Sequence, residues 1–274
     1  MEKLKMKNLK LNYHLTEVCN FGCKFCFAKY KHRCRLSFDE METIVKKTAD
    51  CGFFSGINFA GGEPFLVKRL PELIKIAKDK QLETSVITNG SFLTTEMLDS
   101  ILPFLDCIGI SVHSVSDKIK IKTGSCSKTN EVLSNERLLE ICRYIRRKSN
   151  CKIKINTVVN SLNKTEIISD FIKNLGIDRW KILRCQSFGC NTEMLVTDDE
   201  WNIFCERNYG LKGSVFENNM KDTYIMVNPS GFMIKENPDK NGYEEIGNVF
   251  DNEIQQLLNK HPLHIDEYRL RYSA

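Results

Sequence analysis

Segments with the two-residue period of a strand alternate along this chain with segments that have the period of a helix. Strand-like segments cover 9–16, 56–64, 83–91, 106–114, 151–160 and 179–186, and helices are expected over 39–50, 72–80, 94–102, 131–148 and 164–174. Strand-then-helix units repeated in one direction form parallel sheets with right-handed crossovers. Because the glycine fingerprint of a Rossmann fold is missing, the sequence predicts an α/β protein with a partial (β/α)6 TIM-like barrel.

Local signals support individual elements of this barrel. Leu9, Leu11 and Tyr13 fall on one face of the first strand, as alternation requires. Ser37 and Glu40 have the spacing of a capping box, which predicts the start of the helix over 39–50.

The pattern changes after about residue 190. Thr197 and Glu200 form another capping box, residues 224–236 read as a hairpin around Asn-Pro-Ser-Gly, and a last helix is expected over 251–259. We therefore divide the chain into an N-terminal lead (1–8), the partial barrel (9–190) and a C-terminal extension that covers the barrel (191–274).

Composition excludes several classes of protein. The chain has 274 residues, 42% of them hydrophobic, and its formal net charge of +5 is spread along the sequence. It contains no signal-peptide pattern and no apolar run of about 18 residues. We expect a cytoplasmic protein that binds neither nucleic acid nor membranes.

Three of the 12 cysteines lie close together on the loop after the first strand. Cys19, Cys23 and Cys26 have the spacing C-x3-C-x2-C, at the rim where barrels of this kind carry their active sites. Three thiolates suit an iron–sulfur cluster with one open iron. His32 or Cys34 could instead complete a four-ligand zinc site, as in a zinc-binding interaction module.

The cysteine loop, with Phe25 before its last cysteine, resembles the signature of radical S-adenosylmethionine (SAM) enzymes. The sequence Gly-Gly-Glu-Pro at 61–64 resembles the motif with which this superfamily contacts the methionine of SAM. Within the superfamily the chain resembles the viperin family, in segments that occur in the same order: NYHLTEVCNFGCKFCF (12–27), INFAGGEPFL (57–66), TNGS (88–91), KINTVVN (154–160), RWKILRCQ (179–186) and MKDTYIMV (220–227).

The resemblance implies a [4Fe–4S] cluster on the three cysteines and SAM as cofactor. It also implies conversion of a nucleoside triphosphate (CTP, UTP or GTP) to its 3′-deoxy-3′,4′-didehydro analogue, an activity of antiviral defence. An electron donor such as a flavodoxin or ferredoxin follows from the same resemblance. The residues expected to bind SAM are Phe25, Gly61, Gly62, Glu63, Asn89 and Ser111.

Alternation on two strands points independently to an anion site. Lys152, Lys154 and Asn156 share one face of their strand, and Arg179 and Lys181 share a face of the next. Buried unpaired cations are costly, so these faces predict an anionic ligand in the barrel, although Glu193, Asp198 or Asp199 could neutralise them. By resemblance, Lys154, Asn156, Arg179 and Lys181 hold a triphosphate, and Asn12 and Tyr224 lie near the sugar, with Tyr224 a candidate for the last catalytic step.

One segment departs from the viperin pattern. Animal viperins have an arginine in a glycine-rich loop after the fourth strand, where this chain has IKTGS with Lys122, which we expect to take over as a substrate-binding residue. Other radical SAM enzymes, acting on a peptide or another nucleotide, are the alternative. The paired cysteine spacing of peptide-modifying relatives is missing at Cys185, Cys190 and Cys205.

Overall fold

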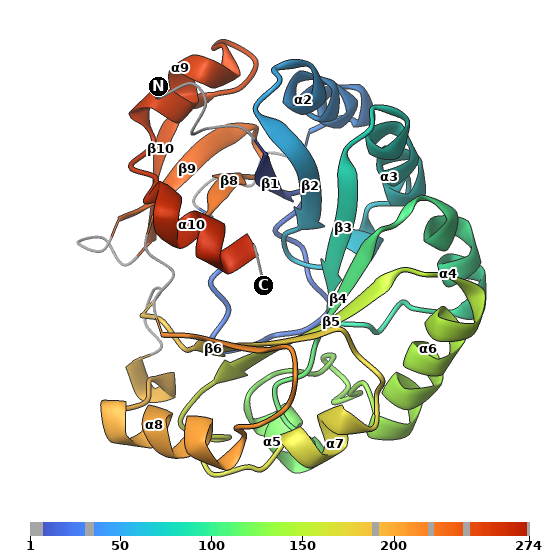
Figure 1. Cartoon of the computed structure of the whole chain (residues 1–274), viewed down its shortest axis with the longest axis vertical. Coiled ribbons are helices and arrows are strands. Elements are labelled where there is room, and N and C mark those ends of the chain that lie inside the picture. The colour runs from blue at the N-terminus through green and yellow to red at the C-terminus, as the bar shows by residue number, and fades with distance from the viewer. Residues whose placement is uncertain (1–7, 31–35, 188–191, 219–221, 238–241, 273–274) are drawn as a thin grey trace.

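A single open sheet of ten strands forms the centre of the molecule. The computed structural model describes residues 8–30, 36–187, 192–218, 222–237 and 242–272. The strand order is β10-β9-β8-β1-β2-β3-β4-β5-β6-β7, and the sheet curves into a partial barrel with helices on its outside (Figure 1). The strands are β1 (Leu9–His14), β2 (Phe54–Ala60), β3 (Glu83–Thr88), β4 (Cys107–Ser111), β5 (Lys152–Val159), β6 (Arg179–Arg184), β7 (Ser214–Glu217), β8 (Ile225–Val227), β9 (Phe232–Asn237) and β10 (Gly242–Asn248).

Parallel pairing runs without interruption from β1 to β6, as the sequence predicts. The helices are α2 (Phe38–Asp50), α3 (Leu70–Asp79), α4 (Thr95–Ile101), α5 (Asp117–Lys122), α6 (Asn135–Lys148), α7 (Ser169–Lys173), α8 (Asp198–Arg207), α9 (Ile254–Lys260) and α10 (Ile265–Tyr272). Both capping boxes are present: Ser37 with Glu40 opens α2, and Thr197 with Glu200 opens α8.

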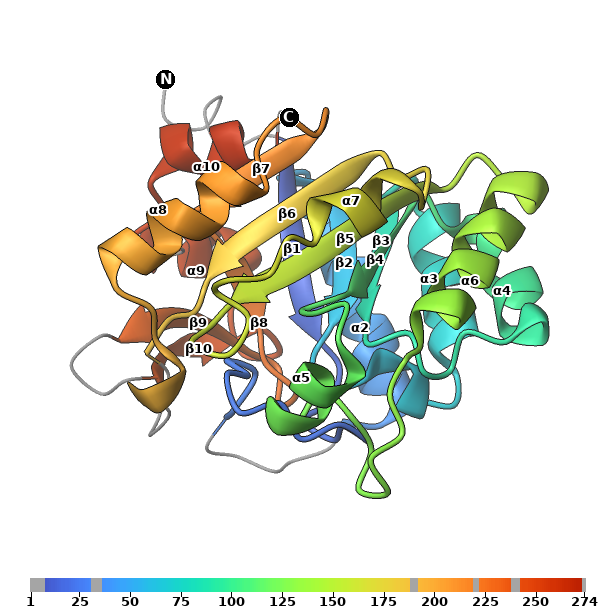
Figure 2. The same cartoon turned by 90° about the horizontal axis from the view of Figure 1, so that it is seen from below.

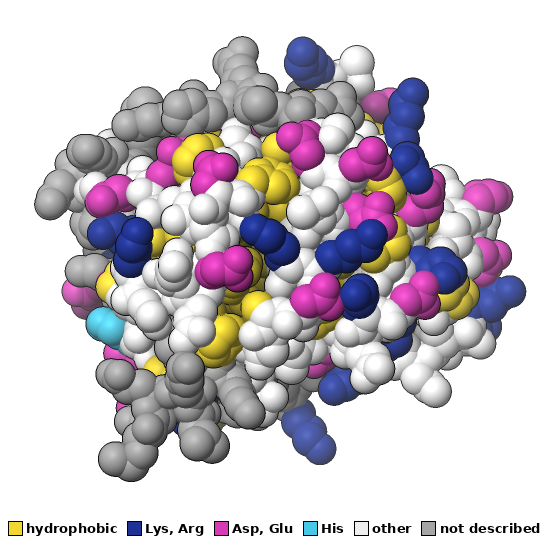
Figure 3. Space-filling model, turned by 90° about the horizontal axis from the view of Figure 1, so that it is seen from above, with side chains coloured by type: hydrophobic (Ala, Val, Ile, Leu, Met, Phe, Trp, Pro, Cys, Tyr) yellow, Lys and Arg dark blue, Asp and Glu magenta, His cyan; other side chains and the backbone are white. Residues whose placement is uncertain are grey.

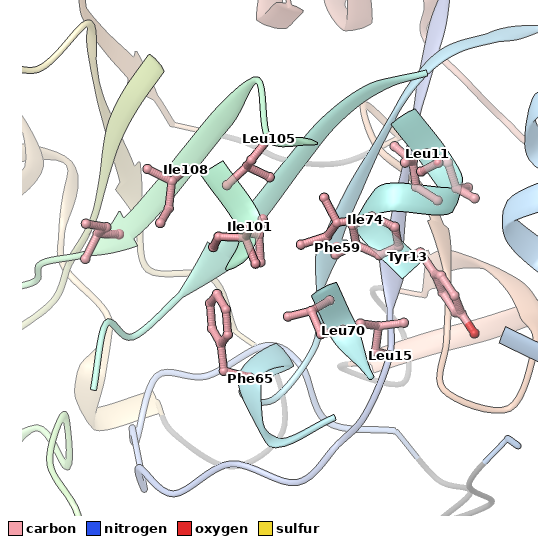
Figure 4. Close-up of a cluster of buried hydrophobic side chains, with 14 of the residues drawn as sticks. Leu11, Tyr13, Leu15, Phe59, Phe65, Leu70, Ile74, Ile101, Leu105 and Ile108 are labelled. Carbon is pink, nitrogen blue, oxygen red and sulfur yellow. The ribbon is translucent and has the colours of Figure 1, made fainter. Parts of the chain in front are cut away.

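The outward face of the sheet packs against the helices to form the core. Leu11 and Tyr13 of β1, Phe59 of β2 and Leu70 and Ile74 of α3 are all buried in this layer (Figure 4). Burying aliphatic and aromatic side chains on one face leaves the alternate residues of each strand to face the barrel interior. The polar side chains of β1, β5 and β6 therefore point inward.

The C-terminal extension lengthens the sheet at both edges. β7 pairs parallel with β6, and β8 pairs parallel with β1. The expected hairpin is formed by β8 and β9, and β10 continues it with antiparallel pairing. β7 and β10 were not expected from the sequence, because each is held by a partner strand rather than by a strong pattern of its own.

Two helices also differ from expectation. α5 lies in a segment whose sequence, DKIKIK, alternates with a period of two, yet it folds as a short helix because Lys120 and Thr123 are buried against neighbouring loops. α10 follows the expected last helix and lies at the end of the barrel where the strands begin (Figure 2). There the Tyr268 hydroxyl accepts a hydrogen bond from Lys10 N (2.5 Å) and donates one to Lys10 O (3.2 Å).

The surface agrees with the mixed charge of the sequence. On the face shown in Figure 3, basic and acidic side chains alternate over short distances. Within the described ranges, no helix is both long and apolar enough to cross a bilayer.

Candidate active site

A cavity of about 520 Å³ fills the interior of the barrel. This volume lies within the range of small-molecule sites. The inward residues of β1, β2, β3, β4, β5, β6 and β8 line it, and the loops after β1, β2, β3 and β4 close its carboxyl-terminal end. The lining includes these predicted site residues: Asn12, Cys19, Cys23, Phe25, Cys26, Gly61, Gly62, Asn89, Ser111, Lys154, Asn156, Arg179, Lys181 and Tyr224.

The three cysteines of the loop after β1 are free thiols at this end of the cavity. Burial, and to a smaller extent the neighbouring Cys26 and Cys19, raise the pKa of Cys23 to about 12. Among the described residues, no three His, Cys, Asp or Glu side chains converge on one metal ion. A cubane cluster gives each of three cysteines a different iron, whereas a zinc ion needs its ligands to converge on one point. His32 and Cys34, the other possible zinc ligands, lie outside the described residues.

The loop after α5 holds the cysteine loop in place. Gly22 N donates to Gly124 O (3.0 Å), and Lys24 N donates to Thr123 O (2.9 Å). Gly124 has a φ of +75°, and a Cβ on it would lie 2.3 Å from Gly22 O. Ser125 Oγ lies 3.6 Å from Cys23 Sγ. The IKTGS segment therefore shapes the cysteine loop.

Gly61 and Gly62 approach the same loop from β2. Gly62 N donates to Thr16 O (2.6 Å), and a Cβ on Gly62 would lie 2.2 Å from Val18 O. The two glycines are thus required for contact with the chain's own backbone at 16–18, in addition to lining the cavity.

Glu63 lies beneath the cavity wall and is not one of its lining residues. Its carboxylate accepts hydrogen bonds from Thr88 Oγ1 (2.7 Å), Phe65 N (3.2 Å) and Asn89 N (2.8 Å). Burial raises its pKa to about 7. Glu63 therefore ties the end of β3 to the loop after β2, and Asn89, in turn, donates to Asn20 Oδ1 (2.8 Å) of the cysteine loop.

Phe25, Ser111 and His113 form the next part of the wall. The rings of Phe25 and His113 meet edge to face with centroids 4.6 Å apart. His113 Nδ1 accepts a hydrogen bond from Val158 N (3.0 Å), and burial lowers the pKa of its imidazole to about 4. His113 was not expected from the sequence, since nothing in SVHS separates a cavity histidine from a core one.

Basic side chains occupy the half of the cavity nearer the start of β5 and β6. Lys154 pairs in register with Arg179, and Asn156 with Lys181, so the expected inward faces lie side by side. Burial lowers the pKa of Lys154, and within the described part of the chain it has no ion-pair partner. Gly109 of the neighbouring strand β4 pairs in register with Lys154, and a Cβ on Gly109 would lie 3.0 Å from Lys154 Cε. The missing side chain makes room for the lysine.

Lys181 does have a carboxylate partner, which sequence analysis did not identify. Glu217 Oε1 of β7 lies 2.7 Å from Lys181 Nζ, whereas Asp198 pairs with Arg184. Lys181 also contacts the Tyr224 hydroxyl and lies 4.8 Å from the centroid of its ring. Glu217 was missed because only the unexpected strand β7 brings it beside β6.

Polar contacts extend the wall across β1, β2 and β3. Asn58 Nδ2 donates to Asn12 Oδ1 (2.9 Å), and Ser85 Oγ lies 2.9 Å from Asn58 Oδ1. Lys10, another unexpected cavity residue, pairs with Glu83 at 2.7 Å.

Lys122 is not brought into the cavity. Lys122 is exposed at the end of α5, whereas Lys120, two residues earlier on the same helix, lines the cavity. The Lys120 ammonium is bound by Asp117 (2.9 Å) and Leu133 O (2.8 Å), so it braces the loops.

Known proteins resemble this chain in sequence and in fold. Residues 13–169 match the radical SAM superfamily. An S-adenosylmethionine-dependent nucleotide dehydratase of Selenomonas ruminantium is 31% identical over 97% of this chain and 99% of its own length. One of Lacinutrix mariniflava is 36% identical over 81% of this chain and 49% of its own length. The S-adenosylmethionine-dependent nucleotide dehydratase RSAD2 of Oncorhynchus mykiss is 30% identical over 79% of this chain and 66% of its own length.

Solved structures share the fold. Streptococcus suis SuiB bound to its precursor peptide SuiA superposes with a TM-score of 0.73 at 14% identity, over 97% of this chain and 69% of that one. Native anSMEcpe with bound AdoMet superposes with a TM-score of 0.69 at 15% identity, over 94% of this chain and 82% of that one. The chain is a radical SAM enzyme. It belongs to the viperin-like family of S-adenosylmethionine-dependent nucleotide dehydratases.

Proposed function

We propose that this enzyme removes water from a nucleoside triphosphate, either CTP, UTP or GTP, giving the 3′-deoxy-3′,4′-didehydro nucleotide. One observation carries the proposal: the three cysteines and the basic residues of β5 and β6 line the same cavity. A triphosphate supplies the anionic charge that the buried Lys154 lacks.

The cysteines Cys19, Cys23 and Cys26 would hold the [4Fe–4S] cluster, which together with bound SAM would supply a 5′-deoxyadenosyl radical. Phe25, Gly61, Gly62, Asn89 and Ser111 line the same cavity as these cysteines and would contact SAM. Glu63 acts on this position through Asn89, since it holds the backbone of that residue.

The remaining residues position the substrate. Lys154, Asn156, Arg179 and Lys181 clamp the triphosphate, while Asn12 and Tyr224 lie beside the ribose. Their arrangement presents C4′ for hydrogen abstraction and allows the 3′-hydroxyl to depart as water. Holding reactants at near-attack distance is the main contribution that a protein makes to such a reaction. Departure of the 3′-hydroxyl as water after the abstraction takes up one proton and one electron, and Tyr224 is our candidate donor for this step.

We further propose that a flavodoxin or ferredoxin reduces the cluster near Cys19, whose side chain is exposed. The product, a nucleotide without a 3′-hydroxyl, cannot be extended by a polymerase. This chemistry supports a role in antiviral defence.

The decisive experiment is a turnover assay. Reconstituted, reduced protein is incubated with SAM and with CTP, UTP or GTP, and 5′-deoxyadenosine and a nucleotide lighter by one water are measured. We expect only one or two of the nucleotides to stimulate both products. Stimulation by none of them contradicts the proposal.

Removing the basic clamp should separate cluster binding from turnover. Lys154→Ala and Arg179→Ala are each expected to reduce nucleotide-dependent turnover at least ~100-fold, as loss of a buried charge contact does, with unchanged iron content. Lys148→Ala, at an exposed lysine of α6, is the matched control and should behave as wild type. Unchanged turnover in both cavity variants refutes the clamp.

A further inference from the structure

Glu217 lies directly behind two of the residues that face the nucleotide site. Its Oε1 is 2.7 Å from Lys181 Nζ, and its Oε2 accepts a hydrogen bond from the Tyr224 hydroxyl (3.2 Å). The side chains of Lys181 and Glu217 are only 10% and 7% exposed. Glu217 itself is absent from the cavity lining, so it acts through Lys181 and Tyr224.

This carboxylate places a negative charge inside a basic cradle. Lys154 and Arg179 of the neighbouring strands also lie on this side of the cavity, and the charge of Glu217 acts on Lys154. Away from solvent, opposite charges interact strongly and like charges repel strongly. A phosphate group that approaches Lys181 must therefore compete with Glu217 for the same ammonium.

The proposed reaction, on which this inference rests, makes such competition useful. Dehydration changes the ribose and leaves the triphosphate intact, so the product keeps every phosphate contact of the substrate. If no negative charge of the protein competes with the phosphates, the basic residues bind product as tightly as substrate. Product release then limits turnover.

We propose that Glu217 is a positioning residue that competes with the triphosphate for Lys181 and thereby permits product release. Before a nucleotide binds, Glu217 keeps Lys181 and Tyr224 oriented and compensates the buried charge. After turnover, it retakes Lys181 as the product leaves.

Removing the competing charge should tighten binding. In anaerobic, reconstituted protein with SAM and no reductant, Glu217→Gln is expected to bind inorganic triphosphate, and the nucleotide that supports turnover, at least fivefold more tightly than wild type. In turnover assays its KM and kcat should both fall, with slower product release. Asp198→Asn removes an 84% exposed carboxylate from its ion pair with Arg184, three residues after Lys181 on β6, and should change none of these values.

Thermal unfolding distinguishes competition from a purely structural role. Glu217→Gln removes the charge of the carboxylate that lies 2.7 Å from Lys181 Nζ, so we expect a lower Tm without ligand and a larger rise on addition of triphosphate than in wild type. A structural role predicts the same loss of Tm with and without ligand, together with weaker binding. That outcome overturns the inference.

A milder variant covers the case in which Glu217→Gln does not fold. Glu217→Asp keeps the negative charge but shortens the side chain by one methylene, which moves the carboxylate away from Lys181. This variant should bind triphosphate about twofold more tightly than wild type. Equal or weaker binding by this variant also overturns the inference. If wild-type protein binds no triphosphate at all, the proposed function fails; if wild-type turnover requires a nucleotide and both variants bind no tighter, only the role of Glu217 fails.

Discussion

At the scale of single residues, alternation along the strands decides which side chains meet the ligand. On β5, Ile153 and Ile155 enter the core while Lys154 and Asn156 face the cavity. A shift of one residue in the register would exchange the two sets and leave charged groups under the helices. The hydrophobic face thus fixes the direction of the basic one.

The buried histidine of β1 gives the protein a specific sensitivity to acid. His14 Nδ1 is hydrogen-bonded to the Tyr30 hydroxyl, and burial lowers the pKa of the His14 imidazole to about 4. In the unfolded chain the imidazole has a pKa of about 6.5, so the unfolded state binds the proton more tightly. Stability therefore falls as pH drops from 6.5 through the folded pKa.

His14→Gln should remove this part of the pH dependence. We expect wild type to lose about 2 kcal/mol more than the variant between pH 7.5 and pH 5. Urea unfolding of the metal-free proteins at the two pH values measures the difference. His113, whose pKa is shifted in the same direction, remains in both proteins as a common background. Identical losses in both proteins would contradict the assignment of a neutral His14.

At the scale of elements, two loops support the cysteine loop, one from each side. The 61–63 segment binds the backbone of Thr16 and Val18, and the 123–124 segment binds that of Gly22 and Lys24. Glycines at both contacts bring the chains closer than any side chain allows. The cysteine loop is therefore shaped by its neighbours.

Gly62→Ala tests this support. A Cβ at Gly62 would lie 2.2 Å from Val18 O, so the 16–18 backbone must move, at a cost of about 1–3 kcal/mol. We expect the variant to fold but to incorporate much less iron than wild type. Gly22→Ala is the control inside the cysteine loop, because a Cβ there meets nothing within 4 Å. Equal iron content in the two variants would show that the contact is dispensable.

Sequence patterns predicted the elements that carry strong local signals. The six parallel strands, both capping boxes and the hairpin at 224–236 are confirmed, because each depends on periodicity or on residues close in sequence. β7 and α10 were not predicted, since they are stabilised by contacts with distant segments. β10 was not predicted because it has no strong strand pattern of its own and is held by its pairing with β9. Glu217 and Lys10 were missed as cavity-side residues because their ion-pair partners are distant in the sequence. Lys122 is exposed, so the presence of a basic residue beside a loop glycine does not show that its side chain points into the cavity.

At the scale of the whole molecule, the barrel is closed differently at its two ends. The cysteine loop and the loops after β2, β3 and β4 lie at the end where the strands finish. Helix α10 lies at the other end, where the buried Tyr268 is hydrogen-bonded to Lys10. A reactive radical inside the cavity requires both ends to exclude water.

Removing α10 should uncouple the two products of the reaction. Truncation after residue 264 opens the end where the strands begin, so we expect more 5′-deoxyadenosine per molecule of dehydrated nucleotide than in wild type. Tyr268→Phe is the milder comparison: it keeps the ring but leaves Lys10 N without its partner, which costs about 1–3 kcal/mol. An unchanged product ratio after truncation would show that α10 does not seal the cavity.

The pairing of β8 with β1 joins a segment near residue 226 to one near residue 12. During synthesis on the ribosome, β1 keeps one edge unpaired until β8, more than two hundred residues further along the chain, has been made. Open edges of this kind invite misassembly, which chaperones counteract. The strand that leads into the cysteine loop thus acquires its second neighbour only once β8 has been made, and until then the cysteine loop leaves the sheet from an edge strand.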